Sequence, residues 1–291
     1  MDGESFFPEA FARRIEEQLG TRQARLLLDA LDGDPVVSVR YNPYKTTSKP
    51  ALEPVPWSRY GFYLTERPSF TLDPSLHGGA YYVQEASSMF LEAVFGAIAD
   101  SEAPLRILDL CAAPGGKSAT LAQYMENKGT LVSCDAAQNR LTLVGGALER
   151  LGVACGRVLH NDAAVYNEAF AGADAVLCDV PCSGLGVLAK KPDIRQKTLD
   201  GLDGLVRLQR AILETAARYV RPGGRLVYST CTLNPDENAG IVRPFLKEHP
   251  EFRTRSVECV LPGTTKDDDF LTLYPFRTGT DGFFIASLER L

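Results

Sequence analysis

Two cysteines stand in short polar segments that follow β-rich runs of the sequence, and both could take part in covalent chemistry. Cys182 lies in the segment DVPCSG at 179–184, and Cys231 lies in the segment STCT at 229–232. A thiolate that adds to carbon 6 of a pyrimidine makes carbon 5 nucleophilic enough to take a methyl group. A base then removes the carbon 5 proton and the thiol leaves. The two cysteines therefore predict methylation of a pyrimidine at carbon 5.

This chemistry needs help from neighbouring groups. A free thiol is only a few per cent thiolate at neutral pH, so the site must lower the pKa of the attacking cysteine. Asp179 begins the first of the two segments, and its carboxyl group can hold the proton that offsets charge developing at ring atom N3. The residues alone do not decide which of the two cysteines attacks.

A turn of small residues is the candidate site for the methyl donor. It follows the β-rich run 107–110 and precedes a helical pattern. Turns between the first strand of an α/β sheet and its helix bind nucleotide-like ligands, because their backbone amides can approach the ligand closely. The residues of the turn are Cys111, Ala112, Ala113, Pro114, Gly115, Gly116 and Lys117.

Acidic residues at the ends of the next predicted strands favour a positively charged adenosyl ligand. These residues are Asp135, Asp162 and Asp179. S-adenosylmethionine fits them, with its ribose on Asp135, its adenine amine on Asp162 and its methionine end on the turn. The alternative is that these aspartates only cap the helices that follow them.

Other ligand classes fit the sequence less well. The turn is not GxGxxG, and Cys111 stands where a phosphate-binding loop needs its first glycine. A zinc site at the two cysteines would need companion ligands, but the histidines are scattered at 77, 160 and 249, so we expect no metal. The acidic run 267–269 is expected to be a solvated loop. The cysteines expected to be small buried side chains are Cys134, Cys155, Cys178 and Cys259.

The elements that must position these residues alternate regularly from residue 105 onward. β-rich runs at 107–110, 130–134, 157–160, 175–178 and 226–229 alternate with helical patterns at 117–126, 140–151, 205–220 and 238–248. This alternation predicts an α/β fold whose parallel sheet carries helices on both faces. The final run, 282–288, follows no long helix and is expected to add an antiparallel strand at the edge of the sheet.

The first hundred residues have a different pattern. Amphipathic patterns predict helices at 7–19, 22–31 and 83–98, and the run 36–40 predicts a strand. Six prolines between residues 43 and 74 indicate mostly loop with short extended pieces. We therefore expect a small N-terminal α+β lobe at 1–103 and an α/β domain at 104–291.

Composition restricts the class of protein. The 291 residues are 45% hydrophobic and 23% charged, which is typical of a globular chain, and no apolar run is long enough for a membrane span. The acidic start, MDGE, is unlike a signal peptide, and seven cysteines without CxxC pairs suggest free thiols in a reducing cytoplasm. The net charge of −6 argues mildly against a nucleic-acid partner. Basic residues after the Cys182 segment could still contact phosphates; they are Lys190, Lys191, Arg195 and Lys197.

Several segments together resemble the NOL/NOP/Sun family of RNA cytosine-C5 methyltransferases. They are LDLCAAPGGK (108–117), DVPCSGLG (179–186), YSTCT (228–232) and DGFFIA (281–286). The resemblance implies a Rossmann-like, class I S-adenosylmethionine-dependent methyltransferase sheet, with RNA as the partner. It assigns Cys231 as the nucleophile and Cys182 as the group that assists proton removal and product release. The positions that match the family's cofactor-binding residues are 111–117, Asp135, Arg140, Asp162 and Asp179.

The segments SVRYNP (38–43) and YYVQEASSM (81–89) resemble the bacterial ribosomal RNA branch of this family. They imply 16S ribosomal RNA, free or in a ribosomal particle, as the substrate of a monomeric cytoplasmic enzyme. Members of that branch carry a further domain, so the chain is either a minimal enzyme or the catalytic part of a longer protein. The alternatives are methylation of transfer RNA, a DNA methyltransferase that would use Cys182, and a non-catalytic RNA-binding assembly factor.

Overall fold

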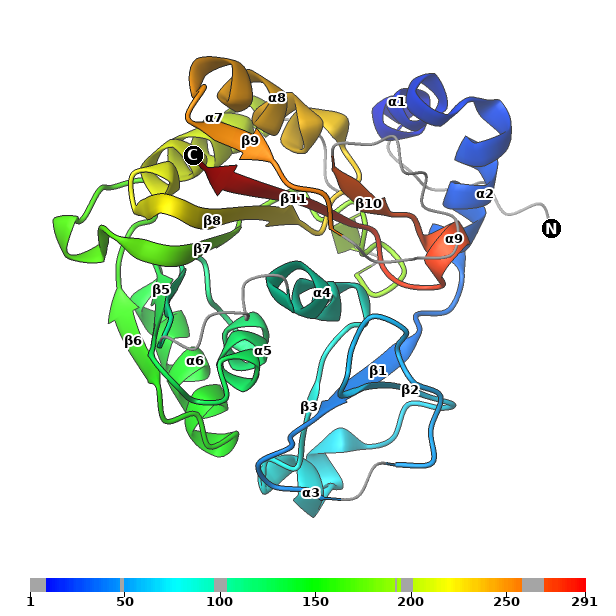
Figure 1. Ribbon diagram of the computed structural model, residues 1–291. Helices are drawn as coiled ribbons and strands as arrows, with labels where there is room; N and C mark the ends of the chain where they lie inside the picture. The colour runs from blue at the N-terminus through cyan, green and yellow to red at the C-terminus, as the bar shows by residue number, and fades with distance from the viewer. Residues whose placement is uncertain (1–8, 48–49, 97–103, 192, 195–200, 258–269) are drawn as a thin grey trace.

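A mainly parallel sheet forms the larger part of the structure (Figure 1). This computed structural model describes residues 9–47, 50–96, 104–191, 193–194, 201–257 and 270–291. Their eight-stranded sheet has the order β10-β11-β8-β7-β4-β5-β6, and β9 pairs with β11. The parallel strands are β4 (Arg106–Asp109), β5 (Thr130–Asp135), β6 (Gly156–His160), β7 (Ala173–Asp179) and β8 (Val220–Thr230). The antiparallel strands are β9 (Phe252–Thr254), β10 (Leu271–Leu273) and β11 (Phe283–Arg290).

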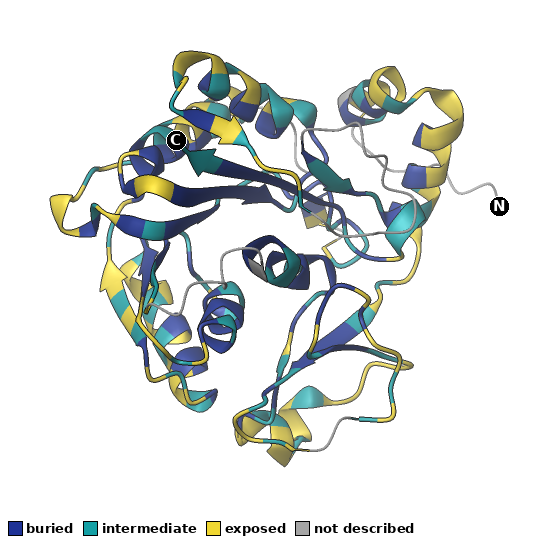
Figure 2. Cartoon of the chain, in the orientation of Figure 1, coloured by how far each residue is buried: buried dark blue, intermediate teal, exposed yellow. Residues whose placement is uncertain are grey.

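Helices cover both faces of this sheet. Successive residues of a strand point to opposite faces, so apolar residues that follow one another in sequence contact different helices. In β7, Val176 and Cys178 join a hydrophobic cluster with α7 (Leu202–Ala217) and α8 (Ala239–Glu248). Ala175 and Leu177 join a second cluster with α4 (Leu91–Gly96) and α5 (Gly116–Tyr124). Figure 2 shows the central strands as buried between these layers. The predicted α/β fold is confirmed, and α6 (Gln138–Arg150) packs beside α5.

A second, smaller sheet forms the core of the N-terminal lobe. Its strands are β1 (Val37–Tyr41), β2 (Gly61–Leu64) and β3 (Tyr81–Val83), all antiparallel, in the order β2-β1-β3. Apart from residues 48–49, which are not described, the connection from β1 to β3 contains only short elements besides β2, namely η1 (Phe70–Leu72) and α3 (Pro74–His77). This agrees with the prediction of loop and short extended pieces between residues 43 and 74.

The two N-terminal helices do not pack on this small sheet. The apolar faces of α1 (Glu9–Leu19) and α2 (Thr21–Asp32) contact Leu185, Leu188 and Leu233 instead. These leucines lie in the segments that follow β7 and β8, which also carry Cys182 and Cys231. The amphipathic patterns predicted the two helices, but only the tertiary structure shows which surface their apolar faces cover.

Two expectations about the elements are wrong. The helix predicted at 83–98 begins at Leu91, because Val83 is extended and pairs with Val39 in the small sheet. A short 3-10 helix, η2 (Ser87–Phe90), leads into α4, and residues 97 and 98 lie outside the described residues. The final strand, β11, is not at the edge, since β10 pairs with its free side. β10 has only three residues, too few to give a periodic signal.

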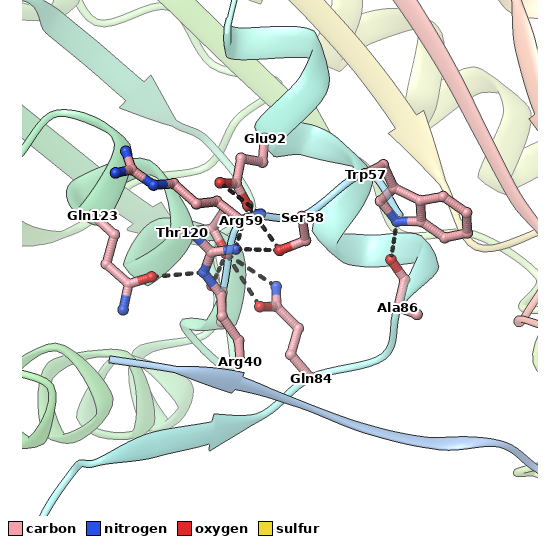
Figure 3. Close-up of polar contacts among 10 residues, drawn as sticks. Arg40, Trp57, Ser58, Arg59, Gln84, Ala86, Glu92, Thr120 and Gln123 are labelled. Carbon is pink, nitrogen blue, oxygen red and sulfur yellow. Dashed lines mark hydrogen bonds and ion pairs between the residues drawn. The ribbon is translucent and has the colours of Figure 1, made fainter. Parts of the chain in front are cut away.

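A buried polar cluster around Arg40 joins the small sheet to helices that pack on the larger sheet (Figure 3). Arg40 of β1 is 2% exposed, and its Nη1 lies 2.6 Å from Oε2 of Glu92 on α4. The same guanidinium donates to Ser58 Oγ at 2.9 Å and to Gln123 Oε1 on α5 at 2.6 Å. These bonds hold β1 against α4 and α5, two helices that pack on the larger sheet. In the part of the chain that the structure describes, no helix is both long and apolar enough to cross a membrane.

Candidate active site

Two thiols meet at the carboxyl ends of β7 and β8. These strands are parallel neighbours, and Asp179 lies opposite Ser229 in their register. Cys182 follows soon after β7 and Cys231 directly follows β8, and their Sγ atoms are 3.2 Å apart. Both residues are partly exposed. The structure thus brings together the two cysteines on which the predicted chemistry depends.

A close backbone contact fixes the segment that carries Cys182 against the one that carries Cys231. The Gly186 amide donates to the Cys231 carbonyl at 3.0 Å, and the Gly282 amide donates to the Gly186 carbonyl at 2.8 Å. A Cβ atom at Gly186 would lie 2.4 Å from the carbonyl oxygen of Gly282 and 2.7 Å from that of Cys231. Only glycine allows three backbones to approach this closely.

The two thiols differ in acid strength. The pKa of Cys231 is lowered by the hydrogen bond with Cys182 and by the ammonium groups of Lys117 and Lys191, against the effects of burial and Asp179. The pKa of Cys182 is raised by the same hydrogen bond, by burial and by a nearby carboxylate. The arrangement fits a Cys231 thiolate that accepts a hydrogen bond from the Cys182 thiol.

Lys117 and Asp179 form a part-buried ion pair beside the thiols. Lys117 Nζ lies 2.8 Å from Asp179 Oδ2, and the Ser229 hydroxyl donates to Oδ1 at 2.8 Å. Burial alone would lower the pKa of Lys117, but the carboxylate outweighs it and raises that pKa. The pair can therefore offset charge that develops on a ring bound next to the thiols. Lys117 was expected only to bind the cofactor, and Ser229 was not among the predicted site residues.

The turn of small residues begins α5, as predicted, and forms a cradle. Gly115 has φ +109°, a conformation that L side chains rarely adopt, and it lies at the N-cap of α5. A Cβ atom at Gly116 would lie 2.8 Å from the ring of Tyr82, which belongs to the lobe. The first backbone amides of a helix have no acceptor within the helix, so the start of α5 could bind a ligand.

The two acids expected to bind the cofactor next to the turn differ in their surroundings. Asp135 is 2% exposed and accepts hydrogen bonds from Arg140 at 2.7 Å and from the Ala113 amide of the turn at 3.3 Å. Asp162 is exposed and lies two residues beyond the end of β6. Its Oδ1 accepts from the Ala164 amide at 2.9 Å, which is the local capping contact of the alternative. A cofactor role for Asp162 stays a prediction.

A cavity of about 160 Å³ lies between the turn and the lobe. One wall consists of lobe residues that the sequence analysis did not assign to the site: Tyr82, Val83, Gln84, Glu85 and Ser88. The opposite wall consists of the turn together with Lys117 and Asp179. A signal for the lobe residues exists in the sequence, since they belong to the segment 81–89 that carries the resemblance. The lobe thus completes the site.

An ionic cluster connects the lobe to the segment that follows Cys182 and to the segment that precedes β11. Lys190 Nζ lies 2.9 Å from Asp281 Oδ2 and 3.8 Å from Glu85 Oε1, and Glu85 also accepts from the Asp281 amide at 3.0 Å. Burial and the Glu85 carboxylate raise the pKa of Asp281 to about 7, which the Lys190 ammonium only partly offsets. Asp281 precedes Gly282, so the cluster lies beside the close backbone contact of the thiol segments.

The basic residues expected to contact phosphates are not equivalent. Lys190 is already engaged by two carboxylates, so its expected availability to RNA is not supported. Lys191 acts electrostatically on Cys231. Arg195 and Lys197 lie outside the described residues.

Three of the four cysteines expected to be small buried side chains are buried. Cys134, Cys155 and Cys178 are buried free thiols, whereas Cys259 and the acidic run 267–269 lie outside the described residues. Within the described ranges, no three or more His, Cys, Asp and Glu side chains gather in a way that could hold a metal ion.

Two sequence families match the chain. One is described as 16S rRNA methyltransferase RsmB/F and matches residues 97–289. The other is described as the N-terminal domain of 16S rRNA methyltransferase RsmF and matches residues 7–86.

Curated relatives have the same descriptions. Ribosomal RNA small subunit methyltransferase F of Escherichia coli O6:H1 is 33% identical over 98% of this chain and 64% of its own length. Probable ribosomal RNA small subunit methyltransferase B of Bacillus subtilis is 38% identical over 73% of this chain and 48% of its own. The chain therefore spans less than two thirds of the length of these relatives.

Solved structures share the fold over nearly the whole chain. A methyltransferase homolog from Pyrococcus horikoshii is 31% identical and superposes with a TM-score of 0.83 over 98% of this chain and 96% of its own. NSun6 from Pyrococcus horikoshii, solved with SFG, is 22% identical with a TM-score of 0.82 over 98% of this chain and 99% of its own.

Proposed function

The chain belongs to the RsmB/F family of 16S rRNA methyltransferases, and we propose on this basis that it methylates carbon 5 of a cytosine in RNA. The methyl donor is S-adenosylmethionine, and the substrate is 16S ribosomal RNA, free or within a ribosomal particle. The observation that carries the proposal is the thiol pair, 3.2 Å apart, at the sheet edge where the turn begins α5. Methylation of oxygen or nitrogen needs at most a base, whereas carbon 5 needs a thiol.

The proposal extends to the organisation of the chain. Residues 1–103 act as a lobe that binds RNA, and residues 104–291 act as the catalytic domain of a cytoplasmic monomer. The point of division lies outside the described residues. In support, the lobe lines one side of the cavity whose other side includes Lys117 and Asp179, the ion pair beside the thiols.

In the first step, Cys231 attacks as the thiolate of the pair. Its sulfur forms a bond with carbon 6 of the cytosine, and the electron pair of the ring moves toward N3. The Lys117–Asp179 pair offsets the charge that develops there. Carbon 5 becomes nucleophilic and takes the methyl group that S-adenosylmethionine supplies when it is bound.

In the second step, Cys182 acts as the base. The pKa of its thiol is raised first by its hydrogen bond with Cys231, and this bond is lost once that sulfur is bonded to carbon. Cys182, which is partly exposed, can then release its proton to water and, as a thiolate, remove the proton from carbon 5. The carbon–sulfur bond breaks, the ring double bond is restored, and Cys231 leaves as a thiolate.

Labelled methyl groups test the function. Incubation with methyl-labelled S-adenosylmethionine should place the label in unmodified 16S ribosomal RNA, and nuclease digestion with mass spectrometry should identify 5-methylcytosine. Parallel incubations contain transfer RNA or DNA. Label in transfer RNA alone would show that transfer RNA, and not 16S ribosomal RNA, is the substrate. Label in DNA alone would indicate a DNA methyltransferase, and binding of RNA without label would indicate an assembly factor.

Replacing Asp135 should weaken binding of the cofactor. In the proposed role its carboxylate accepts hydrogen bonds from the ribose, so Asp135→Asn should raise the Kd for S-adenosylmethionine by roughly 10-fold to 100-fold, as expected for a hydrogen bond to a charged group. Isothermal titration calorimetry measures this. Glu149→Gln, an exposed acid on α6, is the control and should bind normally. A Kd unchanged in Asp135→Asn would contradict the assignment.

A further inference from the structure

A fully buried carboxylate joins the two cysteine segments. Glu237 ends η5 (Pro235–Glu237) and is 0% exposed. Its Oε2 accepts hydrogen bonds from the Ser183 amide at 2.8 Å and from Gln209 Nε2 at 3.0 Å. Its Oε1 accepts from the Ser183 hydroxyl and, at 3.1 Å, from Asn234 Nδ2. Four donors around one carboxyl group fit the ionised form, which accepts hydrogen bonds and donates none.

These donors come from both sides of the thiol pair. Ser183 directly follows one thiol, and Asn234 lies three residues after the other. Gln209, on α7, donates to Glu237 and also to the carbonyl oxygen of Pro181 at 2.9 Å. The carboxylate therefore fixes the two segments at a shared point, and it does so through neutral groups that leave its negative charge uncancelled.

The charged groups around the thiols are distributed unequally. The ionisable side chains that face the pair are Lys117 from α5, Asp179 from β7, Lys191 from the loop after β7, Tyr228 from β8 and Glu237 from η5. The two lysines act on Cys231 and favour its thiolate, against Asp179. Glu237 acts on Cys182 and favours its protonated form, and Tyr228 is neutral because burial raises its pKa.

We propose that Glu237 is a positioning residue that keeps the shared proton of the thiol pair on Cys182, so that Cys231 is the sulfur that attacks. The inference rests on the proposed function, because the order of the thiols has a consequence only if one of them adds to a base. Glu237 touches neither substrate nor cofactor in this proposal. It acts through Cys182, which it also makes a stronger base for the removal of the carbon 5 proton.

Alkylation of the two thiols tests the proposal without any RNA. Iodoacetamide reacts with thiolates, and peptide mass spectrometry gives a separate rate for each cysteine across a pH series. In the wild-type protein, Cys231 should react at lower pH than Cys182. In Glu237→Gln, the ratio of the Cys231 rate to the Cys182 rate at neutral pH should fall about 10-fold, which corresponds to a change of one pKa unit.

Matched variants separate the charge from a merely structural effect. Asp236→Asn removes the same charge from the neighbouring, half-exposed residue, and it should leave the ratio within about twofold of wild type. Glu237→Asp keeps the charge and should retain most of the preference for Cys231. If Glu237→Gln does not fold, Gln209→Lys makes the same test, because its ammonium would neutralise the carboxylate in place.

The outcomes are distinct. A folded Glu237→Gln or Gln209→Lys protein with the wild-type ratio, or a wild-type protein in which Cys182 reacts first, would overturn the proposal. In methylation assays, Glu237→Gln should lower kcat about 10-fold and leave KM within twofold of wild type. The reason is that removal of the carbon 5 proton, and with it release of the methylated RNA, is slowed, whereas RNA binding is not. If the wild-type protein transfers no methyl group to RNA, the proposed function fails, and the alkylation ratio still decides the role of Glu237.

Discussion

Cys231→Ala should abolish methyl transfer and form no covalent complex, whereas Cys182→Ala should trap the protein on methylated RNA. Removing the nucleophile should lower the rate by at least about 10³-fold. Removing the base should slow the addition, because the hydrogen bond from Cys182 lowers the pKa of Cys231. It should not prevent the addition or the methyl transfer, since neither step needs a base at the carbon 5 proton. The adduct would then persist, since the bond from Cys231 to carbon 6 breaks only after that proton is lost. Denaturing gel electrophoresis with labelled RNA detects the complex.

Cys155→Ala is the control for this experiment, because it replaces a buried cysteine away from the thiol pair. Asp179→Asn should slow formation of the adduct without trapping it, since its ion pair with Lys117 acts on the charge that develops during attack. A stable complex that forms with Cys231→Ala and vanishes with Cys182→Ala would reverse the two roles. The arrangement would then be that of a DNA methyltransferase, which uses the thiol of the Pro-Cys segment.

Arg40→Met should lower the free energy of unfolding by about 3–5 kcal/mol, the range for breaking a buried ion pair. The guanidinium is 2% exposed and bonds to Glu92, Ser58 and Gln123 (Figure 3). Its removal takes the donor from the buried Gln123 amide oxygen and the opposite charge from the Glu92 carboxylate, which keeps its bonds from Ser58 and the Arg59 amide. Urea unfolding followed by circular dichroism measures the loss. Gln84, Glu85 and Ser88 of the lobe line the cavity beside the turn, so cofactor binding should weaken as well when the junction is lost.

Arg13→Met is the matched control, because the Arg13–Glu9 pair is exposed, with 68% and 88% of the two side chains accessible. Exposed pairs contribute about 0–1 kcal/mol, so this variant should unfold almost like wild type. Arg40→Lys should recover little, since one ammonium cannot replace a guanidinium that bonds to three partners. Equal losses for Arg13→Met and Arg40→Met would show that the buried junction contributes no more than a surface pair.

Local sequence patterns were sufficient for the central part of the fold. The β-rich runs of the α/β part alternate with helical patterns. This alternation predicted a parallel sheet with helices on both faces. Because parallel strands end at one edge, the segments after β7 and β8 were expected to lie together, and Cys182 and Cys231 do. Gly115 with its positive φ likewise agrees with the predicted turn.

Local patterns were not sufficient where a segment's partner lies elsewhere in the chain. Val83 begins a stretch with a helical pattern, but its pairing with Val39 makes it extended. The apolar faces of α1 and α2 predicted burial without indicating that Leu185 and Leu233 would cover them. β10 was missed because three residues form a strand only when β11 supplies their hydrogen bonds.

The sequence by itself determined which residues could do the chemistry and at which edge of the sheet they would gather, because residue type and periodicity are properties of single segments. Only the tertiary structure decided how these groups act on one another. The 3.2 Å contact joins thiols 49 residues apart, and the bond from Lys190 to Asp281 spans 91 residues. Glu237 had no sequence signal, since its effect on Cys182 depends on burial and on donors from three segments. Distances between segments set hydrogen bonds and pKa values, and these distances follow from packing.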